Sequence, residues 1–213
     1  MLSIVTNILT GLVGLGILNA FIPYQKIHLL FYISSAVLGS YGYLQYNNIP
    51  LSYSTNVINY VCSYFLYDIC CSIIYKFDSI FLFHGIISFF AYLSATQQFY
   101  LRYSLFYLTY EYSSIFLILM KMIPPHQKVL LNINNLFFII TFFLFRILFG
   151  TYISIQVIQE TSSYIYSIYI NNINSFPITC INNSKCLVST IILPVNIIFV
   201  ILNYFWFYKI LRK

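Results

Sequence analysis

Four ionisable residues stand inside strongly apolar stretches of the sequence: Asp68, His84, Glu111 and Arg146. Burying such groups is costly unless they are paired or hydrated, so each one needs a partner. An imidazole that a carboxylate orients can act as a general base. A carboxylate paired with a guanidinium can instead join two helices. These four residues are therefore the candidates for chemistry in this chain.

Other chemical signatures are absent from the sequence. It contains no phosphate-binding glycine loop and no His-Glu-x-x-His, Gly-x-Ser-x-Gly or Cys-x-x-Cys motif. His28 and His126 are predicted to lie in loops without acidic partners, and neither has the spacing of a metal site. The ten Lys and Arg residues are scattered singly, which argues against a nucleic-acid partner. We therefore expect neither a metal nor a bound cofactor.

The elements that hold these residues are predicted to be transmembrane helices. Of 213 residues, 61% are hydrophobic and only 7% are charged, which lies far outside the soluble globular range. Windows of about twenty apolar residues predict about seven spans. They cover residues 4–22, 28–44, 53–75, 80–98, 103–120, 130–152 and 187–208. The sequence thus predicts an all-α membrane protein, with an N-terminal transmembrane helix in 1–25 and a six-helix membrane domain in 26–210.

The distribution of Lys and Arg predicts which way the chain crosses the membrane, since cytoplasmic loops are enriched in these residues. One set of alternate loops holds Lys26, Lys76, Lys121, Lys128, Lys209, Arg212 and Lys213. The other set holds only Arg102 and Lys185. The C-terminus is therefore expected in the cytoplasm and the N-terminus on the lumenal side.

The longest predicted loop, residues 153–186, would then face the lumen. It contains Cys180 and Cys186, which are candidates for a disulfide, and a sequon that makes Asn182 a candidate for N-glycosylation. The alternative is that two cysteines and an Asn-rich segment coincide by chance.

The depths of the four ionisable residues suggest how they pair. Asp68 and His84 fall in the cytoplasmic halves of adjacent spans and are expected to meet. Glu111 and Arg146 fall in the opposite half, about two turns from the lumenal face, and are expected to pair as structural glue.

Tyrosines recur at helical spacing near both acids and could line a polar cavity. They are Tyr60, Tyr64 and Tyr67 near Asp68, and Tyr103, Tyr107 and Tyr110 near Glu111. We single out Tyr64 and Tyr107 as candidates to assist a reaction or to contact a lipid. The alternative is that these hydroxyls only hydrogen-bond neighbouring helices.

The order of four motifs resembles the TLC-domain family. The motifs are YFLYD at 64–68, FLFH at 81–84, EYSSIF at 111–116 and FFLFRI at 142–147. The resemblance covers roughly residues 26–210 and is closest to the smaller TLC-domain proteins. It implies a multi-helix barrel around a cavity for a lipid chain, usually in the endoplasmic reticulum or a related membrane.

The family resemblance also shapes the functional expectation. In ceramide synthases, a histidine pair serves acyl transfer from acyl-CoA to the amine of a long-chain base. Here the first position is His84, but the second is Gly85. We therefore expect a protein that binds or senses membrane lipid and influences lipid composition without ceramide synthase activity. The alternatives are a lipid N-acyltransferase, with acyl-CoA as co-substrate, His84 as base and Asp68 orienting it, and a small transporter.

Overall fold

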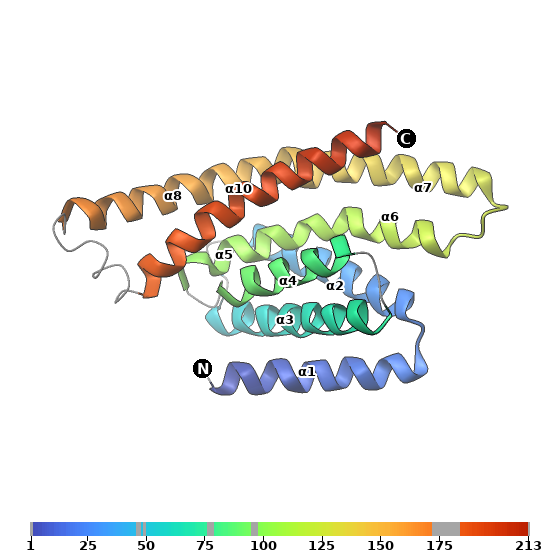
Figure 1. The fold of residues 1–213 in the computed structure, drawn as a ribbon, viewed down its shortest axis with the longest axis horizontal. Helices are drawn as coiled ribbons and strands as arrows, with labels where there is room; N and C mark the ends of the chain where they lie inside the picture. Colours follow the sequence, from blue (N-terminus) through green and yellow to red (C-terminus); the bar gives the residue numbers. More distant parts are fainter. Residues whose placement is uncertain are drawn as a thin grey trace. The chain divides into compact units, whose positions relative to one another are not determined.

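The fold is helical throughout the described part of the chain (Figure 1). This computed structural model describes residues 2–45, 48, 50–75, 79–94, 98–171 and 184–212. The helices are α1 (Leu2–Phe21), α2 (Tyr24–Leu44), α3 (Leu51–Ile74), α4 (Ser79–Ser94), α5 (Gln98–Tyr107), η1 (Leu108–Tyr110), α6 (Glu111–Met122), α7 (Lys128–Thr141), η2 (Phe142–Phe149), α8 (Gly150–Asn171) and α10 (Ser184–Leu211). The prediction of an all-α chain is confirmed for these residues.

Several of the helices are long and apolar enough to cross a membrane. Among the described residues these are Tyr24–Leu44, Ser52–Ile74, Lys128–Asn171 and Lys185–Leu211. Shorter apolar helices cover Thr6–Ala20 and Leu82–Leu93. The remaining predicted span, 103–120, falls in the continuous run of α5, η1 and α6. Every predicted span therefore lies largely on helix, and the chain has the composition and helix lengths of a multi-pass membrane protein.

The predicted loop 153–186 is wrong over much of its length. Helix α8 continues to Asn171 and α10 begins at Ser184, so 153–171 and 184–186 are helical. Gln156, Gln159 and Glu160 end the apolar window, but polar residues do not end a helix, and no Gly or Pro occurs between Tyr152 and Asn171. The rest of the predicted loop, including Cys180 and Asn182, lies outside the described residues.

Prolines set several helix boundaries. Pro23 and Pro50 occupy the positions directly before α2 and α3, where their missing N–H costs no helical hydrogen bond. Helix α6 stops before Pro124, because a residue that precedes proline avoids the α conformation, and Ile123 is accordingly extended (φ −73°, ψ 127°). The start of α2 at Tyr24 brings an additional helical turn, beyond the predicted span, into the membrane domain.

The chain forms two compact units, Met1–Asn135 and Leu136–Lys213. In the first unit, α3 packs against α1 and α4, and α2 packs against α5, η1 and α6 (Figure 1). In the second unit, α8 and α10 lie side by side and η2 also contacts α10 (Figure 1). The first unit therefore contains the helices that carry Asp68, His84 and Glu111, whereas Arg146 belongs to the second.

Glycines on α2 allow the close approach of α5 and η1. A Cβ atom at Gly39 would lie 2.9 Å from the Leu105 carbonyl oxygen and from the Thr109 amide nitrogen. Both of those atoms belong to the backbone and cannot rotate away. By contrast, a Cβ at Gly14 in α1 would meet no atom within 4 Å. Gly39 is therefore required for packing, while Gly14 is not.

We expect Gly39→Ala to lower the free energy of unfolding by about 1–3 kcal/mol, the usual cost of overpacking. Gly14→Ala is the matched control and should leave stability unchanged or slightly increased, because alanine favours helix more than glycine does. Thermal unfolding of the purified protein in detergent would measure both. Equal stabilities for the two variants would contradict the close contact at Gly39.

Candidate functional site

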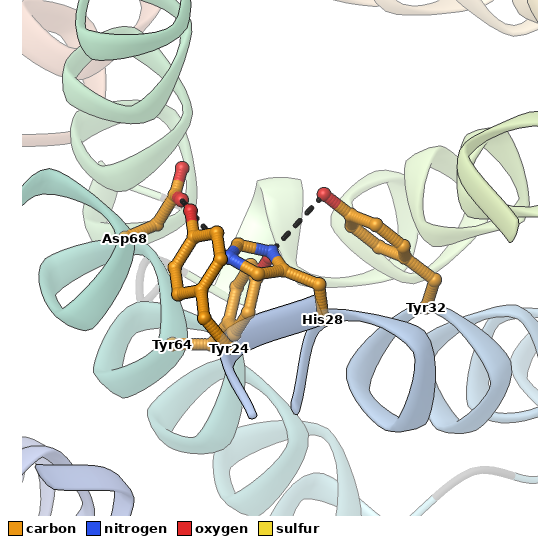
Figure 2. Close-up of polar contacts among 5 residues, drawn as sticks. All are labelled: Tyr24, His28, Tyr32, Tyr64 and Asp68. Carbon is orange, nitrogen blue, oxygen red and sulfur yellow. Dashed lines mark hydrogen bonds and ion pairs between the residues drawn. The ribbon is translucent and has the colours of Figure 1, made fainter. Parts of the chain in front are cut away.

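The candidate site begins with residues spaced four apart on two packed helices. Tyr24, His28 and Tyr32 occupy one face of α2, and Tyr64 and Asp68 occupy one face of α3. Helices α2 and α3 contact each other, so the two rows of polar side chains meet. Figure 2 shows the other four side chains gathered around His28.

The His28 imidazole lies at the centre of this polar cluster. The Tyr24 hydroxyl donates to Asp68 Oδ1 over 2.9 Å, and His28 Nε2 lies 3.6 Å from the same oxygen (Figure 2). On the other side of the ring, the Tyr32 hydroxyl is 3.3 Å from Nδ1, and the Tyr64 hydroxyl also hydrogen-bonds Nδ1. Both ring nitrogens thus face oxygen atoms, and each faces a different kind of oxygen.

Aromatic rings exclude solvent from most of the cluster. Only 3% of His28 and 1% of Tyr64 are exposed, whereas the Asp68 side chain is 13% exposed. The Phe31 ring stacks on Tyr64 with centroids 3.3 Å apart, and the Tyr24 ring meets His28 edge-on at 3.9 Å. Electrostatic interactions are stronger in such surroundings than in water. The cluster therefore contains a nearly dry imidazole beside a carboxylate that is slightly exposed.

Further charged groups act on the carboxylate from α6. Lys121 and Glu111 both lie within electrostatic range of Asp68, and Lys121 also lies within range of His28. These four interacting groups are two carboxylates, one ammonium and one imidazole. In an apolar interior these charges must balance through pairing or protonation.

The surroundings of His28 also decide which nitrogen carries the proton. Phenol hydroxyls are good donors, and two of them point at Nδ1. A lone pair on Nε2 would face the Asp68 carboxylate and be repelled by it. We therefore assign the proton of the neutral ring to Nε2. With the Asp68 carboxylate beside it, this N–H can donate to a bound group while the carboxylate accepts.

The whole helical part of the chain that carries the polar cluster matches one protein family. The TLC-domain profile matches residues 8–212. The chain belongs to the TLC-domain family. No curated protein and no solved structure matches it. The match starts within α1 and covers every helix that contributes to the polar cluster, so this cluster lies inside the TLC domain and the chain is a multi-pass membrane protein of that family.

The expectation for His28 was wrong, because this residue lies in α2 and not in a loop, and its ring lies 3.6 Å from an acid. Gln25 and Lys26 lower the local hydropathy, so the apolar window begins only after the first turn of the TLC domain's α2 helix. The four-residue spacing of Tyr24, His28 and Tyr32 was the available signal. His126 does lie in an exposed turn, as expected.

Helix α4 approaches Asp68 through Gly85. A Cβ at Gly85 would lie 3.4 Å from Asp68 Oδ2 and 3.2 Å from Ile69 Cγ1. The neighbouring His84 points about 100° further around the helix. It is half-buried, and its ring meets the edge of Phe65 at 6.2 Å. A contact between His84 and Asp68 stays a prediction, whereas the contact of Gly85 with Asp68 is a feature of the TLC fold of this chain.

Glu111 and Arg146 are both buried, at 7% and 8% exposure, but they belong to different units. Glu111 begins α6, and Arg146 lies in the π-helix η2 with its guanidinium 5.3 Å from the Phe142 ring centroid. Their pairing stays a prediction, which a Glu111→Gln and Arg146→Gln double-mutant cycle would measure. Tyr107 meets Tyr110 edge-on at 5.4 Å, next to Glu111 in the chain.

Two further predictions concern bonds and metals. Cys186 is fully buried and disulfide-bonded. Its predicted partner Cys180 and the predicted glycosylation site Asn182 lie outside the described residues, so the pairing and the glycosylation stay predictions. No group of three or more His, Cys, Asp or Glu side chains with metal-binding geometry occurs in the described part of the TLC domain.

We expect His28→Gln and Asp68→Asn each to destabilise the protein, since each leaves a buried partner less well satisfied. The double variant should be more stable than the sum of the two effects predicts, by about 0.5–3 kcal/mol. Thermal unfolding in detergent would measure the coupling, with His126→Gln in the exposed turn as control. Strictly additive effects would show that the two side chains do not interact.

Proposed function

We propose that this TLC-domain protein binds or senses a membrane lipid inside its helical domain and thereby influences membrane lipid composition. The observation that carries the proposal is the buried His28–Asp68–tyrosine cluster between apolar helices. Such a cluster offers hydrogen-bonding partners to the polar end of a lipid, while apolar side chains contact its chain. An intramembrane ionisable cluster is also a candidate functional site by default, because its burial is costly.

The same residues support a binding role over ceramide synthase chemistry. Attack of an amine on a thioester needs a base and a second group that handles protons. Gly85, which stands where ceramide synthases have their second histidine, offers only backbone atoms, and Nδ1 of His28 is already occupied by tyrosine hydroxyls. An N-acyltransferase that uses His84 remains the second candidate, because α4 does lie against Asp68.

We further propose that the TLC domain forms a barrel of about seven transmembrane helices around the lipid. The support is that each predicted span falls largely on helix. A membrane of the endoplasmic reticulum or a related compartment fits the family.

We infer a lumenal N-terminus and a cytoplasmic C-terminus from the seven Lys and Arg residues in one set of predicted loops against two in the other. A protease-sensitive tag after Lys213 should therefore be digested in intact microsomes. A C-terminal tag that is digested only after detergent treatment would contradict this orientation.

To test the function, we would purify the protein, extract its retained lipid, and compare that lipid with the bulk membrane by mass spectrometry. We expect one lipid class to be enriched in the wild type and lost in Asp68→Leu. The same protein in nanodiscs, given acyl-CoA with sphingoid bases or lysolipids, should form no new product.

Two outcomes would contradict the proposal. Retained lipid with the bulk composition would remove the binding role. Acyl-CoA-dependent product that disappears in His84→Ala would replace the binding role with the acyltransferase.

A further inference from the structure

We propose that the His28–Asp68 pair binds the hydroxyl group of a hydroxylated long-chain lipid, and that Gly85 keeps one side of the Asp68 carboxylate open for it. This inference rests on the proposed function and adds the chemical class of the ligand. It assigns ligand contact to His28, which lies outside the four short sequence motifs that resemble the family.

The donor half of this site is a buried imidazole N–H. His28 is 3% exposed, and its Nε2 atom has no hydrogen-bond partner. The distance of 3.6 Å to Asp68 Oδ1 allows an electrostatic attraction but exceeds the length of a hydrogen bond. A buried donor without a partner costs about 1–3 kcal/mol, which a bound acceptor would recover.

The acceptor half is the Asp68 carboxylate. Oδ1 accepts from Tyr24 and faces His28, so it is enclosed on the α2 side. Oδ2 faces α4 at the one position of that helix surface where the residue has no side chain, Gly85. The Asp68 side chain is 13% exposed even though its neighbours His28 and Tyr64 are almost fully buried. A side chain larger than alanine at position 85 would cover this oxygen.

The protonation of the pair selects the ligand. A lipid ammonium could donate to Asp68, but it has no lone pair that could accept from the Nε2–H. A carboxylate or phosphate could accept from Nε2–H, but it would be repelled by Asp68. A hydroxyl donates and accepts with a single atom and carries no charge. It is therefore the lipid group that satisfies both halves of the site.

The experiment uses the full-length protein in nanodiscs and a sixteen-carbon alcohol that carries a diazirine in its chain. Covalent labelling on illumination is followed by mass spectrometry, with hexadecanol, hexadecylamine and palmitate as unlabelled competitors. We expect hexadecanol to compete about tenfold better than the other two, since a hydrogen bond to a charged group is worth about one decade in affinity. The labelled peptides should include parts of α2, α3 or α4.

Variants test which residues cause the preference for hexadecanol. His28→Phe retains the ring but loses the donor, and Gly85→Val covers Asp68 Oδ2; each should reduce the preference for hexadecanol to about that of palmitate. His126→Phe in the exposed turn and Gly14→Val, whose position meets no atom within 4 Å, are the matched controls and should keep the preference. Because the competition in the wild type is decisive by itself, a variant that fails to fold does not prevent the test.

Different results would contradict the hydroxyl assignment, the assignment to these residues and the proposed function. Equal competition by all three compounds, or stronger competition by hexadecylamine, would overturn the hydroxyl assignment while leaving lipid binding intact. A hexadecanol preference that persists in both site variants would overturn the assignment to His28 and Gly85. Absence of any competable labelling would instead contradict the proposed function, together with the inference that rests on it.

Discussion

The main constraint on the first unit is that a carboxylate between apolar helices must be satisfied by side chains from another helix. Asp68 of α3 obtains a hydrogen bond from Tyr24 and a nearby imidazole from His28, both on α2. His28 in turn is held by Tyr32 on its own helix and by Tyr64 on α3. Because these hydrogen bonds and charge contacts join side chains of α2 to side chains of α3, the cluster fixes both the rotation and the register of α2 against α3. Helix packing and site geometry are therefore consequences of the same contacts.

The position of α2 is reinforced on its other sides. Gly39 and Gly42 admit the backbone and side chains of α5 and η1, and the Ser40 hydroxyl is 2.8 Å from that of Tyr112 on α6. Toward α3, the hydroxyls of Ser34 and Tyr60 are 2.7 Å apart. Close packing and hydroxyl contacts of this kind are how helices associate where the hydrophobic effect no longer distinguishes neighbour from lipid. Because α2 is held on several sides, the position of the His28 imidazole on it is also held.

Hydropathy predicted where the helices lie, because twenty apolar residues have few alternatives in a membrane protein. Hydropathy failed to predict the helix ends where polar residues continue a helix beyond its apolar part. The polar turn at Gln25 and Lys26 hid the start of α2, and Gln156 to Glu160 hid the continuation of α8. The need of Asp68 for a partner was predictable from the cost of burying a charge, and the position of Tyr64 on the same helix face was predictable from its spacing. Contact with His28 was not, because the sequence does not fix how two helices are rotated against each other.

The continuous helix Lys128–Asn171 contains 44 residues. Its length is about 66 Å at 1.5 Å per residue. A hydrocarbon core is about 30 Å thick, and even a tilt of about 40° leaves a projection of roughly 50 Å. This helix therefore overhangs the hydrocarbon in a bilayer of any ordinary thickness. A change in membrane thickness would change which of its turns are hydrated, but the helix would still be long enough to cross the hydrocarbon. This part of the chain therefore tolerates membrane thicknesses that would cause a hydrophobic mismatch for a helix of ordinary length.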